Sequence, residues 1–278
     1  MKDEKKGLVP KLRFPEFREA GEWAEKSLGE LGRIVTGKTP STKNAELWGS
    51  GVPFITPTDI SEDQKYQLAT ARKVLKTKDV KTVPKGSVVY TCIASIGKIA
   101  ITTCESATNQ QINSVIVHSG MNGEFIYYSL ENLTPWIKSI PASSTLAIIN
   151  KTEFSGILIK LPSAHQEQQK IADCLSSLDA LITAQADKVN ALKTHKKGLM
   201  QQLFPREGET TPRLRFPEFR EAGEWERKLL NEVVESVKTG KLDANAMVEG
   251  GAYRFYTCAK NYYQIDRFAF EGEALLTT

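Results

Sequence analysis

The chain has 278 residues, with 37 Lys and Arg against 33 Asp and Glu, so its formal net charge at pH 7 is +4. Of these residues 40% are hydrophobic and 25% are charged, ordinary values for a globular protein with one large or two modest cores. No stretch approaches the ~18 consecutive apolar residues of a membrane span, and the start lacks the apolar segment of a secretory signal, so we exclude a membrane protein and expect a cytoplasmic one.

The first element is a Pro-containing lead-in over residues 11–23, which we predict to be extended. Its segment 12–23, LRFPEFREAGEW, returns unchanged at residues 214–225, which gives twelve identical residues at an offset of 202. The similarity continues, with one inserted residue, between residues 24–38 and 226–241. Identity of this length does not arise by chance, so the chain contains a duplicated unit of about 200 residues.

A short helix or helix-to-strand segment is predicted over residues 23–35, and its end overlaps a motif of catalytic type. Residues 32–39, GRIVTGKT, match the phosphate-binding pattern G-x-x-x-x-G-K-[ST]. Such a loop needs a strand before it and a helix after it, but residues 36–51 are polar and contain Gly and Pro, which predicts a loop. The repeat keeps Gly240 and Lys241 but lacks the first Gly and the hydroxyl residue. A basic surface loop is therefore favoured over nucleotide binding.

The rest of the first unit mixes strands with one helix. Runs of β-branched residues predict strands at residues 52–55, 87–93, 98–103, 113–118 and 156–160. Helical spacing of apolar residues predicts a helix over residues 125–138. The mixture predicts a compact α+β domain over residues 11–160.

Positive charge gathers between residues 65 and 85, where seven basic residues stand against one acidic residue. Such a stretch can neutralise DNA phosphates, although a solvated surface explains it equally well. Polar segments suited to hydrogen bonds with base edges accompany it. They occupy residues 39–44, 56–59, 95–98, 108–111 and 143–145. The Asn-Gln-Gln run in the fourth of these segments has the alternative role of capping backbone groups.

A long helix is predicted over residues 163–204, with Ser163 as its N-cap and Gln166 completing a capping box. Its apolar residues keep a 4-3-4-3 spacing, which is typical of a coiled coil. They are Ile171, Leu175, Leu178, Ile182, Val189, Leu192, Leu199 and Leu203. Roughly 42 helical residues extend on the order of 60 Å, so this helix needs a second helix along its seam. The alternative is one helix of a larger bundle.

Residues 205–212 form a predicted linker, and the second copy of the domain starts at residue 213. Because the similarity to the first unit stops at Thr278, inside a predicted strand, we expect residues 213–278 to be an incomplete second domain. The fold class is thus a mixed α+β domain followed by a long coiled-coil helix and the start of a second copy of that domain.

The cysteines and histidines are too scattered to predict a metal site. No C-x-x-C pair occurs among the cysteines, which are Cys92, Cys104, Cys174 and Cys258. Reduced thiols, rather than a zinc site or a disulfide scaffold, are therefore expected. The histidines, also without ligand or triad spacing, are His118, His165 and His195. We accordingly expect no catalytic centre.

Taken in order, several short motifs carry a resemblance to a known family. They are Trp23 with residues 28–31, then residues 36–41 (TGKTPS), 107–113 (ATNQQIN), 150–151, and 161–162 leading to 167–172 (EQQKIA). Together with the duplication and the heptad helix, these motifs resemble the specificity (S) subunit of type I restriction-modification systems. The resemblance covers essentially the whole chain.

The resemblance implies two target-recognition domains alternating with two long antiparallel helices, each domain reading one half of a split DNA site. It also implies that the subunit is not an enzyme and binds no cofactor. Its partners are double-stranded DNA, modification subunits that methylate adenine with S-adenosylmethionine, and restriction subunits that use ATP and Mg. The helices then act as a ruler, because one DNA turn advances ~34–36 Å.

From the polar segments and this resemblance we predict two sets of functional residues. The DNA-contacting set is Lys38, Thr39, Ser41, Lys43, Thr58, Ser95, Lys98, Asn109, Gln110, Ser144 and Lys151. The helix-pairing and partner-docking set is the eight-residue apolar seam of the long helix. No metal or catalytic residue is predicted.

Compared with the family pattern, this sequence has neither a second full domain nor a second long helix. It is thus expected to be truncated within its second target-recognition domain. Two chains could then pair their helices and recognise a palindromic split site, or the product is a non-functional cassette. A stand-alone DNA-binding protein is a further alternative, and a P-loop NTPase is the least favoured. The identical segments also predict recombination that exchanges recognition domains.

Overall fold

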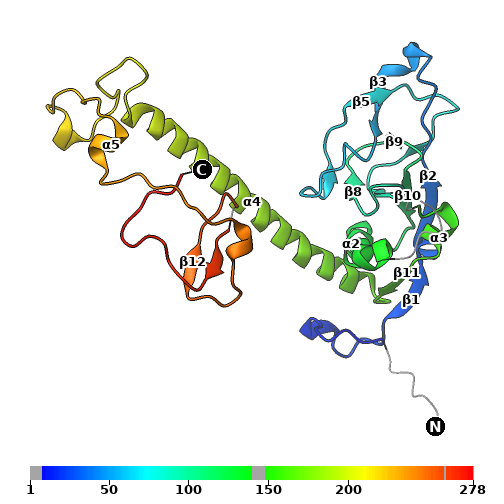
Figure 1. Cartoon of the computed structure of the whole chain (residues 1–278). Helices are drawn as coiled ribbons and strands as arrows, with labels where there is room; N and C mark the ends of the chain where they lie inside the picture. Colours follow the sequence, from blue (N-terminus) through cyan, green and yellow to red (C-terminus); the bar gives the residue numbers. More distant parts are fainter. Residues whose placement is uncertain (1–7, 140–147, 260, 278) are drawn as a thin grey trace, which may run out of the picture. The chain divides into compact units, whose positions relative to one another are not determined.

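The computed structural model describes residues 8–139, 148–259 and 261–277 (Figure 1). The chain divides into two compact units, Met1–Val189 and Asn190–Thr278, and the helix α4 (His165–Leu203) is continuous across the boundary. The domain boundaries expected from the sequence stay predictions. Among the described residues, no helix combines the length and apolar character that crossing a membrane requires.

The first unit contains a five-stranded sheet with the strand order β2-β10-β7-β8-β4. Neighbouring strands are antiparallel, except that β4 and β8 run parallel. The strands are β2 (Gly32–Thr36), β10 (Ile112–Val117), β7 (Val88–Thr91), β8 (Ile99–Thr102) and β4 (Tyr66–Gln67). The predicted strands at 87–93, 98–103 and 113–118 are confirmed as β7, β8 and β10.

A four-stranded sheet has the order β5-β3-β9-β6. Its strands are β5 (Arg72–Val74), β3 (Trp48–Ile55), β9 (Ser106–Thr108) and β6 (Thr82–Val83). Because β3 begins at Trp48, the loop predicted over 36–51 is wrong in its last part. The strands β4, β5, β6 and β9 have only two or three residues each, so pairing with distant partners defines them and no local pattern predicts them.

A two-stranded ribbon joins the start of the unit to its end, because β1 (Ala24–Ser27) pairs antiparallel with β11 (Leu158–Leu161). The lead-in before β1 is not wholly extended, since Pro15 starts the 3-10 helix η1 (Pro15–Phe17). After β1, a capping box between Ser27 and Glu30 starts the single-turn helix α1 (Leu28–Leu31), which runs directly into β2.

The main core lies between the five-stranded sheet and the helix α2 (Gly123–Ser139), which packs on β7 and β8. Its fully buried side chains include Tyr90, Ile126, Leu130 and Phe154, the last from the short helix α3 (Lys151–Ser155). Burial raises the pKa of Tyr90 to about 12. The opposite sheet face supplies Val89, Ala100 and Ile112 to a smaller cluster with Ile55 and Ile60, which joins the two sheets. The periodic helix predicted at 125–138 is confirmed.

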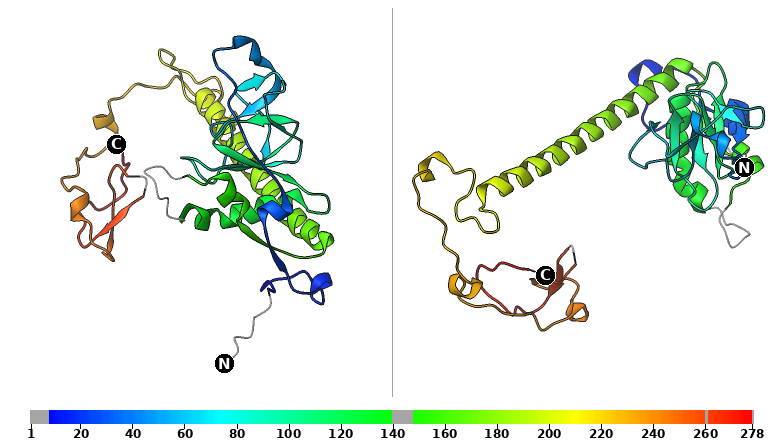
Figure 2. Two further views of the ribbon diagram at one scale, coloured as in Figure 1. Left: turned by 90° about the vertical axis from the view of Figure 1, so that its right-hand side faces the viewer. Right: turned by 90° about the horizontal axis from the view of Figure 1, so that it is seen from above.

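The long helix is confirmed over His165–Leu203 and runs without a break (Figure 2). Its 39 residues correspond to a length of about 60 Å. The predicted Ser163 cap is wrong by one residue, since the backbone N–H groups of Glu167 and Gln168 donate to the Ala164 carbonyl. The Glu167 and Gln168 side chains are buried in contacts with the domain, and these contacts fix where the helix begins. Ile171 and Leu175 of the predicted seam pack against the main core, and Leu199 and Leu203 are half-buried. The four seam residues between them are exposed. Leu178 is 49% exposed, Ile182 67%, Val189 47% and Leu192 58%.

The second unit repeats the beginning of the first at the same offset of 202. The 3-10 helix η3 (Pro217–Phe219) corresponds to η1, and α5 (Leu230–Val233) corresponds to α1. It continues with the 3-10 helix η4 (Ala244–Ala246) and the antiparallel pair β12 (Tyr253–Phe255) and β13 (Tyr263–Ile265). Among its described residues Ile265 is the one buried hydrophobic side chain, and Leu230 is 61% exposed where Leu28 is fully buried.

Candidate nucleic-acid interface

Four loops meet at one end of the two sheets, and they contain most of the predicted DNA-contacting residues. We call residues 37–44, 56–60, 92–98 and 109–111 the loop cluster. The strand register places them together, because Thr36 pairs with Asn113 and Ile112 with Thr91 at the same sheet end. The backbone N–H of Asn109 donates to the Ile55 carbonyl at 3.1 Å, which holds the loop after β9 beside the end of β3 in the four-stranded sheet.

The loops that follow β2 and β9 are held together by short backbone hydrogen bonds. Gly37 N–H donates to the Ile112 carbonyl at 3.1 Å, and Lys38 N–H donates to the Thr108 carbonyl at 2.9 Å. A Cβ atom added to Gly37 would overlap the backbone of Asn109 and the side chain of Thr108, far inside van der Waals contact. Only glycine therefore allows the two loops to approach this closely.

Thr39 and Gln110 are brought side by side at the surface, where the Thr39 hydroxyl donates to Gln110 Oε1 at 2.6 Å. The neighbouring Asn109 is 7% exposed, and its side chain bonds both the side chain and the backbone N–H of Gln111. Asn109 therefore shapes the turn that presents Gln110, which is the capping role anticipated for this run. Lys38 is exposed beside them.

Lys98 connects two other loops of the cluster. Its Nζ donates to the carbonyls of Pro57 and Ile60 at 3.0 and 3.3 Å, so it is only partly available to a ligand. Thr58 and Ser95 are exposed on the loops that it joins. Next to Ser95, Ala94 has a φ of +62°, a left-handed conformation that costs energy for a non-glycine residue.

Four predicted residues remain, two of them in the loop cluster and two outside it. Ser41 and Lys43 are exposed on the loop after Thr39, where the Trp48 indole donates to the Ser41 carbonyl at 3.2 Å. Lys151 is exposed at the start of α3. Ser144 lies outside the described residues. Direct DNA contact by any of these side chains stays a prediction.

A groove lies beside the loop cluster, between the edge strands β2 and β6, and all of its charged lining residues are cations. Its charged lining residues are Arg33, Lys81 and Lys151, with Thr36 and Thr82 among the uncharged ones. Arg33 was not predicted as a contact. The signal that could have found it is its exposed place on β2, where its neighbours on both sides are buried. Lys81 belongs to the basic stretch 65–85. Three cations without a carboxylate in the lining make this groove suited to phosphate groups.

The basic residues between 65 and 85 do not form one continuous cationic surface. Lys65 is 8% exposed in its side chain and bonds Glu124, Tyr128 and Ser176 at 2.9, 3.2 and 2.5 Å. It thus joins α2 to α4. Lys76 pairs with Glu105 at 2.6 Å. Part of the positive charge of this stretch is therefore neutralised by ion pairs within the protein. Lys81 is one of the residues that can still bind a ligand.

The geometry is contrary to a nucleotide-binding loop at residues 32–39. The N–H groups of Gly37 and Lys38 are already bonded to carbonyls of the sheet, whereas a phosphate-binding loop must point such groups at the ligand. A loop ending in the 3-10 helix η2 (Ala45–Leu47) follows, in place of the helix that the motif requires. No cluster of three potential metal ligands occurs in the described parts of the chain.

The start of α4 is held to the domain by three side chains that we call the helix clamp: Arg13, Trp23 and Glu167. Arg13 donates from Nε and Nη2 to the two carboxylate oxygens of Glu167, both at 2.7 Å. The Trp23 indole donates to the same carboxylate at 3.2 Å. The side chains of Arg13 and Glu167 are 8% and 1% exposed, and the hydrogen bonds to Glu167 raise the pKa of Arg13.

A family model described as "Type I restriction modification DNA specificity domain" matches residues 20–194. The chain belongs to this family. The matched range contains the loop cluster, the cationic groove and the clamp residues Trp23 and Glu167. The expected resemblance and the expected fold class, mixed α/β sheets with a long helix, are therefore confirmed.

Curated relatives are named as specificity subunits of type I restriction enzymes. The MjaIX specificity subunit of a type I restriction enzyme from Methanocaldococcus jannaschii is 33% identical over 168 residues. The HindI specificity subunit from Haemophilus influenzae is 36% identical over 148 residues. The matches cover 58% and 51% of this chain but only 39% and 32% of the relatives. The chain thus corresponds to less than half of the length of these two proteins.

Two solved structures share the fold. One comes from work on assembly and conformational transition of the type I R-M system, with a TM-score of 0.52 and 20% identity over 70% of this chain and 48% of that chain. The other is the S subunit of a type I restriction-modification system from M. genitalium. It has a TM-score of 0.50 and 15% identity over 90% of this chain and 63% of that chain. At these identities the likeness establishes the architecture alone.

The buried Cys92 thiol, at the start of one loop of the cluster, gives a testable prediction about thiol labelling. Cys92, which follows β7, is 2% exposed, and burial raises its pKa to about 11. At pH 8 about one thiol in a thousand is then ionised. Cys104, Cys174 and Cys258 are exposed, so a thiol reagent at pH 8 should label these three and spare Cys92 in the native chain. Mass spectrometry of the labelled peptides checks this, and rapid native labelling of Cys92 would contradict the packing.

Proposed function

We propose that this chain is a non-catalytic DNA sequence-recognition subunit of a type I restriction-modification complex. It recognises one half of a split DNA site and directs adenine methylation and restriction by partner subunits. The observation that carries the proposal is the loop cluster, in which Lys38, Thr39 and Gln110 are presented together next to a cationic groove. The curated relatives are named as specificity subunits of type I restriction enzymes.

The cationic groove and the loop cluster have different roles in DNA binding. The cations of the groove, Arg33, Lys81 and Lys151, contact phosphates and supply affinity without sequence preference. The loops place amide, hydroxyl and ammonium groups where base edges are exposed, because Gln pairs bidentately with adenine and Lys bonds the acceptors of guanine. The predicted contacts of the loop cluster therefore determine the sequence that is recognised.

The exposed seam of α4 supplies the second half of the recognition. Leu178, Ile182, Val189 and Leu192 pair with the equivalent helix of a second chain in antiparallel fashion. A helix of about 60 Å separates two recognition domains by more than one DNA turn of ~34–36 Å. The modification subunits bind S-adenosylmethionine, the restriction subunits bind ATP and Mg, and this chain binds neither. The complex acts in the cytoplasm.

The methylome tests this function directly. The chain is co-expressed with its modification subunit in a host without other methylation, and methyladenine is mapped by single-molecule sequencing. A split palindromic motif is expected if two copies pair through α4, and a split motif with unlike halves would show that another chain supplies the second domain. No methylation, with a modification subunit that works with another specificity subunit, would overturn the proposal.

A stand-alone DNA-binding protein is the second candidate, because the cationic groove needs no other subunit to contact phosphates. This candidate predicts tight binding of split sites by the chain alone. A specificity subunit should instead gain at least tenfold in affinity when the modification subunit is present. Titration of labelled DNA with and without that subunit separates the two.

The groove gives a prediction about salt dependence. The double variant Lys81→Gln and Lys151→Gln removes two phosphate contacts, so the slope of log K against log salt should fall by about 2. Cognate and unrelated DNA should weaken by the same factor, since these side chains do not contact bases. The matched control is Lys26→Gln with Lys160→Gln, two exposed lysines on β1 and β11, which should leave the slope unchanged. A loss confined to the cognate sequence would show that the groove contacts bases instead.

A further inference from the structure

Arg72, which the predicted DNA-contacting set does not include, lies at the end of the four-stranded sheet that carries two loops of the loop cluster. It begins β5, and the strand register pairs it with Phe54. The next residue, Ile55, ends β3 and pairs with Thr108 at the end of β9. The loops that follow β3 and β9 therefore start beside Arg72.

Hydrogen bonds to Asp59 hold the start of β5 against the loop that follows β3. The backbone N–H of Ala71 donates to Asp59 Oδ1 at 2.8 Å. The other carboxylate oxygen of Asp59 accepts from the N–H and the hydroxyl of Thr56 at 2.8 and 2.6 Å. The backbone of Arg72 therefore has a fixed place relative to this loop, on which Thr58 is exposed.

The guanidinium of Arg72 is supported by an aromatic ring. Its Cζ atom lies over the Trp48 ring, 5.3 Å from the centroid. Trp48 packs edge-on against the buried Phe54, with 5.0 Å between the ring centroids. Its indole N–H donates to the carbonyl of Ser41, in the first loop of the cluster, at 3.2 Å. These two contacts fix the Trp48 ring, and the ring holds the guanidinium beside that loop.

The N–H donors of this guanidinium are available to a ligand. In the part of the chain that the structure describes, the exposed Arg72 side chain forms neither a hydrogen bond nor an ion pair. Arg13 differs, because both arms of its fork are bound to Glu167. Arg72 thus presents a planar fork of donors that Trp48 positions and that the protein itself does not satisfy.

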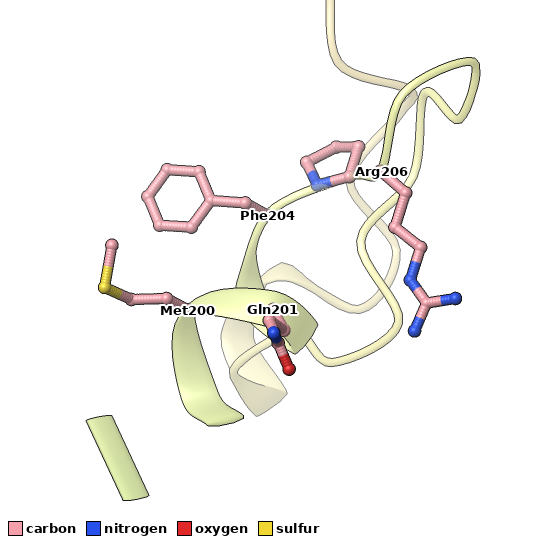
Figure 3. A pocket seen from close by; sticks show the side chains of 5 residues that line it. Met200, Gln201, Phe204 and Arg206 are labelled. Carbon is pink, nitrogen blue, oxygen red and sulfur yellow. The ribbon is translucent and has the colours of Figure 1, made fainter. Parts of the chain in front are cut away.

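The second unit contains a comparable pair. Its 3-10 helix η4 precedes the antiparallel strands β12 and β13, as η2 precedes β3 and β5. Arg254, exposed on β12, lies over the Tyr262 ring at 4.9 Å from the centroid. Arg206, in contrast, extends away from the neighbouring Phe204 ring in a shallow pocket at the end of α4 (Figure 3). An arginine positioned on an aromatic ring therefore recurs on the corresponding strand pairs.

We propose that Arg72 contacts a guanine of the half-site and is a specificity-determining residue. The inference rests on the proposed recognition of DNA and adds the identity of one base to it. The arginine fork matches the O6 and N7 acceptors of guanine, and no other base presents two acceptors in the major groove. Because Trp48 already orders the side chain, little further rotamer freedom is lost on binding. This favours a base contact, which needs one geometry, over a phosphate contact, which many geometries satisfy.

The test is a selection from randomised DNA by the full chain in complex with its modification subunit. The wild-type chain should select a motif whose half-site contains guanine. Arg72→Gln should lose at least tenfold of the preference for guanine at one position. That position should become indifferent or select adenine, because Gln pairs bidentately with adenine. The other positions should keep their preferences.

Lys73→Gln is the matched control, since it removes the same charge from the next exposed residue of β5. It should keep all base preferences. Arg72→Lys retains the charge but lacks the fork, so it should weaken the preference for guanine at the same position. All three variants should unfold at the wild-type temperature, because both side chains are exposed.

The wild-type motif distinguishes failure of this inference from failure of the proposed function. A half-site without guanine, or unchanged base preferences in the Arg72→Gln chain, would overturn the inference. An equal loss of affinity for all sequences would identify a phosphate contact and would overturn it too. A wild-type chain that selects no motif with an active modification subunit would overturn the proposed function, and the assignment of Arg72 with it.

Discussion

A chain with Leu178→Asp and Leu192→Asp is expected to lose the proposed helix pairing and, with it, at least 100-fold of the proposed methylation of the cognate site. Both leucines lie on the seam of α4 and are about half exposed in the single chain, so replacing them removes little from the core of the first unit. In a paired helix they become buried, and two carboxylates per chain would then enter an apolar seam without partners. The fold of the α+β domain should stay intact.

Light scattering of the complex, methylation of the cognate site and thermal unfolding of the chain measure these effects together. The matched control is Ala180→Asp with Ala191→Asp, which adds the same charge to exposed positions of the same helix that are off the seam. This control should assemble normally. If the leucine variant also assembles, the seam is assigned to the wrong face.

The second large effect is expected from Gly37→Ala. The added methyl group would overlap the backbone of Asn109 and the side chain of Thr108, so the loops after β2 and β9 must separate. The bonds from Gly37 and Lys38 to the sheet then weaken. We expect a loss of about 1–3 kcal/mol in the free energy of unfolding and a loss of about 100-fold in affinity for the cognate site, equivalent to about 2.7 kcal/mol.

The control is the same substitution at Gly21, where a Cβ atom would meet nothing within 4 Å. Its effect on stability should stay within about 0.5 kcal/mol. Calorimetry and DNA titration of both variants compare a crowded glycine with a free one. Wild-type affinity in the Gly37→Ala chain would show that the geometry of these two loops does not matter for DNA recognition.

The sequence predicted the parts of this fold that have a strong local pattern. In α2 and α4 the apolar residues recur with helical spacing over many residues, and β7, β8 and β10 are runs of β-branched residues. The local sequence pattern alone therefore identifies these elements. The strands β4, β5, β6 and β9 are too short for any period and exist through their partners. The lead-in illustrates the same limit, because it was expected to be extended and Pro15 begins a 3-10 turn there.

The candidate site was predicted less completely, for a related reason. The loops of the cluster are visible in the sequence as polar segments, but which of their side chains face outward depends on contacts between distant loops. Asn109 and Lys98 use their polar atoms inside the protein, and Lys65 does the same within the basic stretch. The clamp between Arg13 and Glu167 joins residues 154 apart in sequence, a distance that no local pattern spans.

The helix clamp has a mechanical consequence for the spacing of the DNA site. A helix of about 60 Å works as a lever arm, so a tilt of about 5° at Glu167 moves its far end by about 5 Å, more than the ~3.4 Å that separates neighbouring base pairs. In the proposed recognition of a split site, the rigid bidentate ion pair at the pivot would therefore set the number of base pairs between the two half-sites. Because the clamp residues lie outside the loop cluster, a change in the loops would then alter the bases that are recognised and leave the number of base pairs between the half-sites unchanged.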